Sequence, residues 1–133
     1  MEGSDGNFYG TTSAGGAGYD GTSGSGNGTI FTITSNVTLT TLFSFNYSNG
    51  SSPNGLLKAS SGNFFGTTAN GGIYGGTVFQ ITTNATLTTL VFFLSAFPRA
   101  GLVEGNDGNF YGATTSDGRG GNGTVFRITT KAR

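Results

Sequence analysis

Apolar and polar residues alternate along several short stretches of this chain, and the clearest of these stretches occurs three times. It has the form Thr-Val/Ile-Phe-x-Ile-Thr and covers residues 29–34, 77–82 and 124–129. In the middle copy the alternation places Phe79 and Ile81 on one side of the chain and Val78 and Gln80 on the other. A two-residue period with β-branched and aromatic residues is typical of a β-strand. Each copy therefore predicts one strand.

Three other strand-like segments accompany this one. A segment with two neighbouring aromatic residues covers 7–12, 63–68 and 109–114, a Thr-Leu-Thr-Thr-Leu segment lies within 37–45 and 85–93, and a Gly-Leu segment covers 55–58 and 101–104. In 37–45 the alternation predicts that Leu39, Thr41, Phe43 and Phe45 share one face. Gly and Asn between the segments favour tight hairpin turns, and 46–54 is expected to be a connection. The order of the segments predicts ten strands and an all-β fold.

The segments repeat with a spacing of 47 or 48 residues, measured between Gly28, Gly76 and Gly123. Four antiparallel strands in such a period are typical of one blade of a β-propeller. We therefore expect a single repeat domain, 1–133, of about three blades at 1–50, 51–97 and 98–133, the first and last incomplete. Gly10, Gly66 and Gly112 lie inside predicted strands, and we attribute them to close packing of adjacent blades.

Closed propellers contain about four to eight blades, so this chain alone is too short to close a ring. Either copies of the chain associate, which is what we expect, or the chain is a piece of a longer array of blades. Two chains would form a closed ring of about six blades, whereas contacts between unlike faces that do not close would form an open head-to-tail assembly.

A family resemblance follows from these segments. Gly101-Leu-Val-Glu-Gly-Asn-Asp-Gly-Asn-Phe-Tyr, followed by Gly-Thr-Val-Phe-Arg-Ile, resembles an NHL-type propeller blade. The whole repeat, with Thr-Leu-Thr-Thr-Leu and Asp-Gly-Asn-Phe-Tyr-Gly-Thr-Thr, more closely resembles the GloVer-type tandem repeat of large bacterial surface proteins. The resemblance implies a propeller-like repeat and an extracellular or cell-surface location, although the chain starts without a signal-peptide pattern. It supplies no catalytic residue.

Composition removes most kinds of chemistry. Six acidic residues balance six basic ones, so the net charge gives no footprint for nucleic acid. The chain has no His and no Cys, which excludes a Ser-His pair, a disulfide and a zinc site built on those ligands. No apolar run approaches the roughly 18 residues of a membrane-spanning helix, so we expect no membrane insertion. We also expect no enzyme activity, no cofactor and no metal, and we interpret Asp5 and Asp107 as turn residues.

Two groups of residues are candidates for contact with other molecules. Tyr19, Tyr47 and Tyr74 lie in predicted loops and are candidates for ligand binding, including stacking on a sugar ring. Leu90, Val91, Phe92, Phe93 and Leu94 form an apolar run that we expect at a blade–blade or chain–chain contact. The sequence thus predicts a non-catalytic structural or adhesive repeat module of an exported protein. The alternative is a carbohydrate-binding propeller assembled from several chains, with glycans as partners at the blade junctions.

Overall fold

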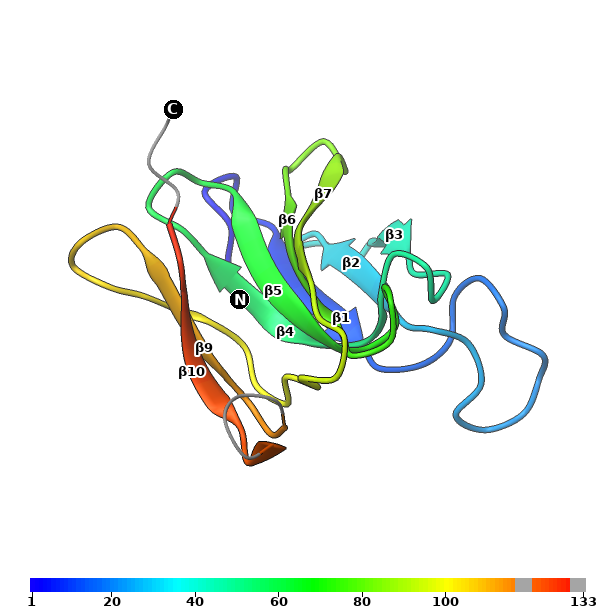
Figure 1. The fold of residues 1–133 in the computed structure, drawn as a ribbon. Coiled ribbons are helices and arrows are strands. Elements are labelled where there is room, and N and C mark those ends of the chain that lie inside the picture. Colours follow the sequence, from blue (N-terminus) through cyan, green and yellow to red (C-terminus); the bar gives the residue numbers. More distant parts are fainter. Residues whose placement is uncertain (117–120, 130–133) are drawn as a thin grey trace.

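The computed structural model describes residues 1–116 and 121–129, and these residues form ten β-strands and no α-helix (Figure 1). The strands are β1 (Phe8–Thr12), β2 (Thr29–Ile33), β3 (Leu39–Ser44), β4 (Ser51–Lys58), β5 (Phe64–Asn70), β6 (Thr77–Ile81), β7 (Leu87–Phe92), β8 (Val103–Glu104), β9 (Phe110–Thr114) and β10 (Thr124–Ile128). The predicted all-β fold is confirmed. Within these residues no helix has the length and apolar character needed to cross a membrane.

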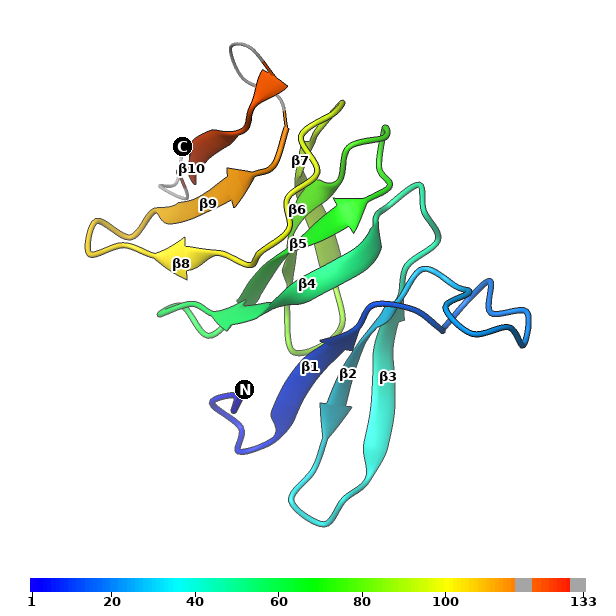
Figure 2. The same cartoon turned by 90° about the horizontal axis from the view of Figure 1, so that it is seen from below.

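The strands form three antiparallel sheets, and each sheet is a simple meander of consecutive strands. We call β1–β3 the first sheet, β4–β7 the second sheet and β8–β10 the third sheet. The four-stranded second sheet lies between the other two (Figure 2). The three sheets do not close into a ring, so the propeller architecture stays a prediction.

The turns that lead into β1, β5 and β9 have one geometry. In each, a backbone N–H at the start of the turn donates to the carbonyl of the Asn before the aromatic pair: Gly3 to Asn7 (2.8 Å), Ala59 to Asn63 (2.9 Å) and Gly105 to Asn109 (2.8 Å). Gly6, Gly62 and Gly108 occupy the position with positive φ. This left-handed conformation is strained for residues with a Cβ, which explains the recurring glycine.

Two details differ from the predicted pattern. Strand β4 begins at Ser51, inside the expected connection 46–54. Its pairing with β5 shifts register between Pro53 and Gly55, and such a bulge tolerates a proline that cannot donate a ladder hydrogen bond. The Pro in the sequence therefore marks an irregular strand instead of a connection.

The prediction that Leu39, Thr41, Phe43 and Phe45 share one face is wrong. The register between β2 and β3 shifts at Ile30/Phe31, because Thr41 pairs with Phe31 whereas Phe43 pairs with Ile30. The extra residue, Leu42, interrupts the alternation. As a result Leu42 and Phe43 both pack against the core, Phe45 is fully buried and Leu39 is exposed.

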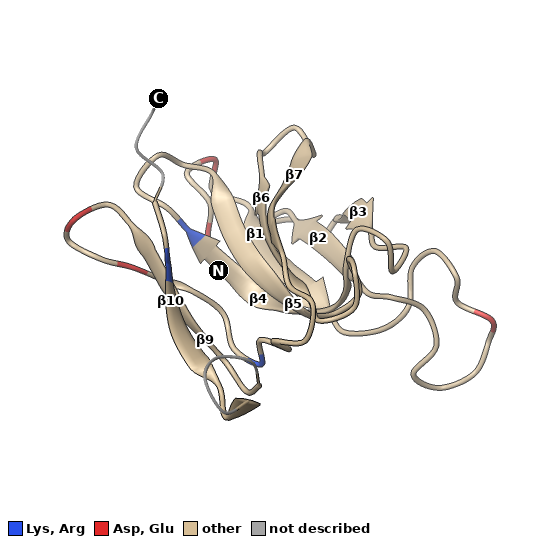
Figure 3. Ribbon diagram, in the orientation of Figure 1, with Lys and Arg blue, Asp and Glu red and all other residues tan. Residues whose placement is uncertain are grey.

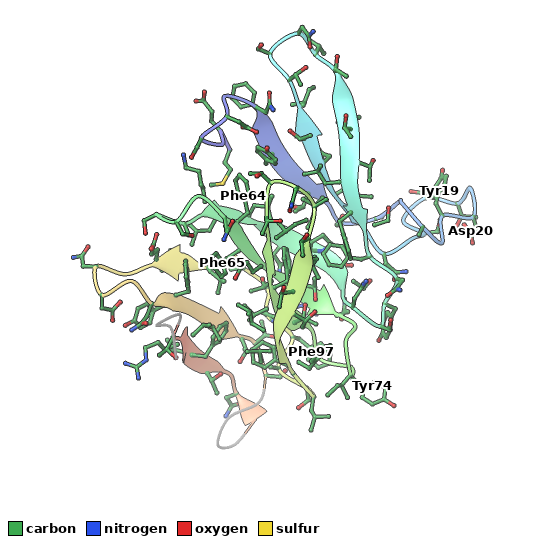
Figure 4. The ribbon with its side chains drawn as sticks, turned by 90° about the horizontal axis from the view of Figure 1, so that it is seen from above. Tyr19, Asp20, Phe64, Phe65, Tyr74 and Phe97 are labelled. Atoms are coloured by element: carbon green, nitrogen blue, oxygen red, sulfur yellow. The ribbon has the colours of Figure 1, made fainter. Side chains whose placement is uncertain are left out.

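The apolar core lies between the sheets, in two clusters. The first cluster joins the first and second sheets and contains Tyr9, Ile30, Phe45, Phe64, Phe79 and Ile81. The second joins the second and third sheets and contains Ala59, Phe65, Val78, Leu102 and Phe110. Neighbouring residues of a strand point to opposite faces, so Phe64 and Phe65 of β5 enter different clusters (Figure 4). The predicted separation of Phe79 and Ile81 from Val78 is confirmed.

The glycines inside β1, β5 and β9 have a reason other than the predicted one. Gly10, Gly66 and Gly112 pair with Phe31, Phe79 and Phe126 of the next strand in the same sheet. A Cβ on these glycines would lie 2.7, 2.6 and 2.5 Å, respectively, from the Cζ atom of the paired ring. The glycines therefore make room for a ring from their own sheet, and attributing them to an adjacent blade was wrong.

Candidate functional site

The three tyrosines predicted as ligand contacts are exposed but do not converge. Tyr19 lies between β1 and β2, Tyr47 between β3 and β4, and Tyr74 between β5 and β6. The loops of Tyr47 and Tyr74 touch, because the Gly72 N–H donates to the Tyr47 carbonyl at 2.6 Å. Tyr19 projects from a separate loop at a distance from Tyr74 (Figure 4). The three side chains therefore do not form one binding site.

The apolar run 90–94 is divided between two environments. Val91 and Phe93 pack against the second core cluster, and the ring centroid of Phe93 lies 5.4 Å from that of Phe126 in the third sheet. Leu90, Phe92 and Leu94 are exposed. Two of the five residues thus contact the neighbouring sheet, and the other three form an exposed apolar edge along and just beyond β7.

A cavity that the sequence pattern did not single out lies between the second and third sheets. Its volume is about 420 Å³, and it is lined by Ala59, Ser60, Ser61, Asn63, Phe65, Gln80, Glu104, Asp107, Gly108 and Phe110. Most of these residues belong to the turns before β5 and β9, which bring their polar side chains together only when the sheets stack. The Phe65 and Phe110 rings are stacked at this junction, with centroids 4.2 Å apart.

The hydrogen bonds around this cavity leave it rich in acceptors. Ser60 donates to the Glu104 carboxylate through its backbone N–H (3.0 Å) and its hydroxyl (2.8 Å). Tyr111 donates its hydroxyl to Asp107 at 2.5 Å, and the Asn109 N–H donates at 3.0 Å. These bonds hold the pKa of Asp107 below its ordinary value, the Tyr111 bond contributing most. The same bond raises the pKa of Tyr111.

The lining therefore carries two carboxylates and no Lys or Arg. Of the described acidic residues of the third sheet, Glu104 ends β8 and Asp107 lies in the turn that follows, and Figure 3 shows both in red at this end of the sheet. Asn109, between the lining residues Gly108 and Phe110, is buried, and its side-chain oxygen has no hydrogen-bond partner among the described residues. Such a cavity is suited to accepting hydrogen bonds from hydroxyl groups. Asp117, Arg119, Lys131 and Arg133 lie outside the described residues.

The whole chain matches the model of a known repeat family. The model of the Gloeobacter/Verrucomicrobia repeat matches residues 1–133. The chain belongs to this repeat family. No curated protein and no solved structure matches the chain. The predicted resemblance to the GloVer-type repeat is confirmed, whereas the NHL-like detail stays a prediction.

In this Gloeobacter/Verrucomicrobia repeat chain the third sheet also has an open apolar face. Leu102, Phe110 and Phe126 point toward the second sheet, so their neighbours Val103, Tyr111 and Val125 point away from it. A shallow, mainly apolar hollow of about 290 Å³ lies there, lined by Ala100, Gly101, Val103, Tyr111, Gly112, Ala113 and Val125. This face of the third sheet is equivalent to the face of the second sheet that packs against the third. No described sheet covers it.

Proposed function

We propose that this repeat is a non-catalytic structural or adhesive module of an exported protein, and that it acts by self-association of its sheets. One observation carries the proposal. At each internal junction the second ring of one aromatic pair packs on the first ring of the next pair: Tyr9 on Phe64 with centroids 4.4 Å apart, and Phe65 on Phe110 with centroids 4.2 Å apart. This arrangement leaves one ring of a pair over at each end of the stack.

The polar groups of the repeat support a structural role. In every sheet a Thr in the strand with the aromatic pair (β1, β5 or β9) shares a hydroxyl–hydroxyl hydrogen bond with the first Thr of the next strand. The pairs are Thr12–Thr29, Thr68–Thr77 and Thr114–Thr124. Asp5 and Asp107 accept from Tyr9 and Tyr111 in the same way. These side chains stabilise turns and strand pairs, which is the role expected of repeated polar residues in a stacked array.

The test of this proposal is the mass of the chain as a function of concentration, measured by sedimentation and native mass spectrometry. We expect the mass to rise with concentration. A discrete dimer would support a closed ring, and a ladder of species would support an open assembly. A monomer at every concentration would contradict self-association.

A second candidate function is carbohydrate binding in the cavity between the second and third sheets. The observation that favours it is the pair of carboxylates, Glu104 and Asp107, that line one cavity, since sugar hydroxyls donate hydrogen bonds to carboxylates. A glycan screen followed by titration tests it. Saturable binding should be lost in Glu104→Gln and kept in Glu2→Gln, which makes the same change at the equivalent position of the first sheet. Absence of saturable binding to any glycan would reject this candidate.

A further inference from the structure

We propose that the open face of the third sheet docks onto the open face of the first sheet of a second copy, head to tail. We call the open face of the third sheet, with Val103, Tyr111 and Val125, the trailing face. We call the open face of the first sheet, with Phe8, Phe31 and Glu2, the leading face. The inference rests on the proposed self-association and specifies which surfaces meet and in what register.

The aromatic residues supply the first argument. Phe64 and Phe110, the first rings of their pairs, are 1% and 2% exposed because a preceding sheet covers them, whereas Phe8 at the same repeat position is 45% exposed. Tyr111 is the second ring of the last pair, and no sheet of the described chain follows it. Tyr111 on Phe8 of a second copy would reproduce the Tyr-on-Phe contact that Tyr9 makes with Phe64.

One aliphatic residue of each sheet, at the same repeat position, supports the same docking. Ile30 in β2 and Val78 in β6 are both 0% exposed, because each is covered by the sheet that follows. Val125 holds the same repeat position in β10 and is 81% exposed. This side chain adjoins the apolar hollow of about 290 Å³. A following sheet would bury it as the internal junctions bury Ile30 and Val78.

A polar contact fixes the register and the choice of partner. At the second junction the turn residue Ser60 donates two hydrogen bonds to Glu104, the residue at the end of β8. Asn106 is the equivalent turn residue of the third sheet, and Glu2 is the equivalent of Glu104 in the first sheet. The second copy therefore offers a carboxylate as an acceptor for the Asn106 backbone N–H.

This contact is selective, because it cannot form at the junction between the first and second sheets. There the position equivalent to Glu104 is Lys58, whose ammonium has only donors and cannot accept from the turn N–H of Ser4. A third sheet docked on another second sheet would repeat that mismatch. Docking on the first sheet of a second copy restores the carboxylate, and because the two faces differ the contact is heterologous.

Thiol crosslinking tests the register, because the natural sequence has no Cys. Chains with Glu2→Cys are mixed with chains with Asn106→Cys and treated with a short bifunctional thiol reagent at a concentration where the mass shows association. We expect a mixed crosslinked dimer, and no crosslinked dimer of either variant alone. The double variant Ser60→Cys/Glu104→Cys calibrates the reagent, because these positions should link within one chain.

Two results would overturn the inference and leave the proposed function standing. One is association without the mixed crosslink. The other is a crosslinked dimer formed by the Glu2→Cys variant alone, which would indicate a two-fold contact of like faces. A chain that stays monomeric at every concentration would overturn both the inference and the proposed function.

Val125→Asp provides an independent measurement. It should weaken association at least about tenfold, because docking would bury an unpaired carboxylate. Val37→Asp is the matched control, since it makes the same change at a residue that is 76% exposed in the β2–β3 turn, and it should leave association unchanged. Equal association of Val125→Asp and the natural chain would overturn the inference.

Discussion

At the scale of single residues, the hairpins of this repeat use one turn geometry with two different solutions for its left-handed position. The turns before β1, β5 and β9 place glycine there, whereas the β2–β3 and β6–β7 turns place Val37 (φ 70°) and Ala85 (φ 72°) there. The Val37 N–H donates to the Thr34 carbonyl at 2.9 Å, and Thr34 also bonds Asn36 through its side chain. The turn is thus held by hydrogen bonds against an unfavourable backbone conformation.

Replacing Val37 by Gly should therefore stabilise the chain. A β-branched residue in the left-handed region is strained, and relieving that strain is expected to raise the free energy of unfolding by about 1 kcal/mol. Ala85→Gly should give a smaller gain, because Ala lacks the branched Cβ. Urea unfolding of the two variants measures both changes. A loss of stability in Val37→Gly would show that the turn does not carry the strain assigned to it.

The loop between β1 and β2 contains a carboxylate, Asp20, whose pKa is lowered by hydrogen bonds. Thr22 donates to Asp20 through its hydroxyl (2.6 Å) and its backbone N–H (3.0 Å), and these bonds lower the pKa of Asp20 from 3.8 to about 2. The charged form is favoured by the fold, so its stabilisation is present above the ordinary pKa and is lost as the pH falls through the folded pKa. Carboxyl NMR titration should find the pKa of Asp20 at about 2, and Thr22→Val should move it upward. An ordinary Asp20 pKa in the natural chain would contradict these bonds.

At the scale of the strand, the paired ring and glycine are the feature that most restricts substitution. A Cβ on Gly66 would lie 2.6 Å from the Phe79 ring and 2.5 Å from the backbone oxygen of Gly55. For a Cβ on Gly10 the three nearest atoms all belong to the Phe31 ring, the first of them at 2.7 Å. Backbone cannot yield as a ring can, so the same substitution should differ in cost between the two sheets.

We expect Gly66→Ala to destabilise the chain by about 2–3 kcal/mol, in the upper part of the range of about 1–3 kcal/mol for overpacked cores, and Gly10→Ala to cost less. Combining Gly10→Ala with Phe31→Leu should restore part of the loss, because the smaller side chain makes room for the methyl group. A double-mutant cycle by urea unfolding measures this coupling. Equal costs at the two glycines, or no coupling to Phe31, would show that the cross-strand contact does not govern these positions.

The strands themselves follow from local alternation, and this is why the sequence predicts all ten. The register shifts at Ile30/Phe31 and Pro53/Gly55 do not, because a bulge depends on the partner strand as much as on its own residues. The reason for Gly66 is equally non-local, since Phe79 is 13 residues away in the sequence and adjacent only after pairing. The cavity with Glu104 and Ser60 could not be predicted for the same reason, because Glu104 ends a strand of the third sheet and Ser60 lies in a turn of the second.

At the scale of the whole molecule, each sheet contributes little core of its own and depends on its neighbours for burial. The consequence is visible at the end of strand β7, where Phe92 is the last residue of the strand and Phe93 follows it. The Phe93 ring packs on Phe126 across the junction, whereas Phe92 is exposed on the other side. The two phenylalanines thus form a matched pair for separating stability from association.

Phe93→Ser should lower the free energy of unfolding by about 3 kcal/mol, because it removes an aromatic ring from the contact between two sheets and leaves a polar group there. Phe92→Ser should change it by less than about 0.5 kcal/mol, as is usual for exposed positions, but should reduce association if the apolar edge of β7 contacts another chain. Thermal unfolding and sedimentation of both variants separate the two effects. An unchanged melting temperature for Phe93→Ser would mean that the contact between the second and third sheets does not contribute to stability. An unchanged mass of the associated species for Phe92→Ser would exclude the β7 edge from assembly and leave the end faces as the contacts between chains.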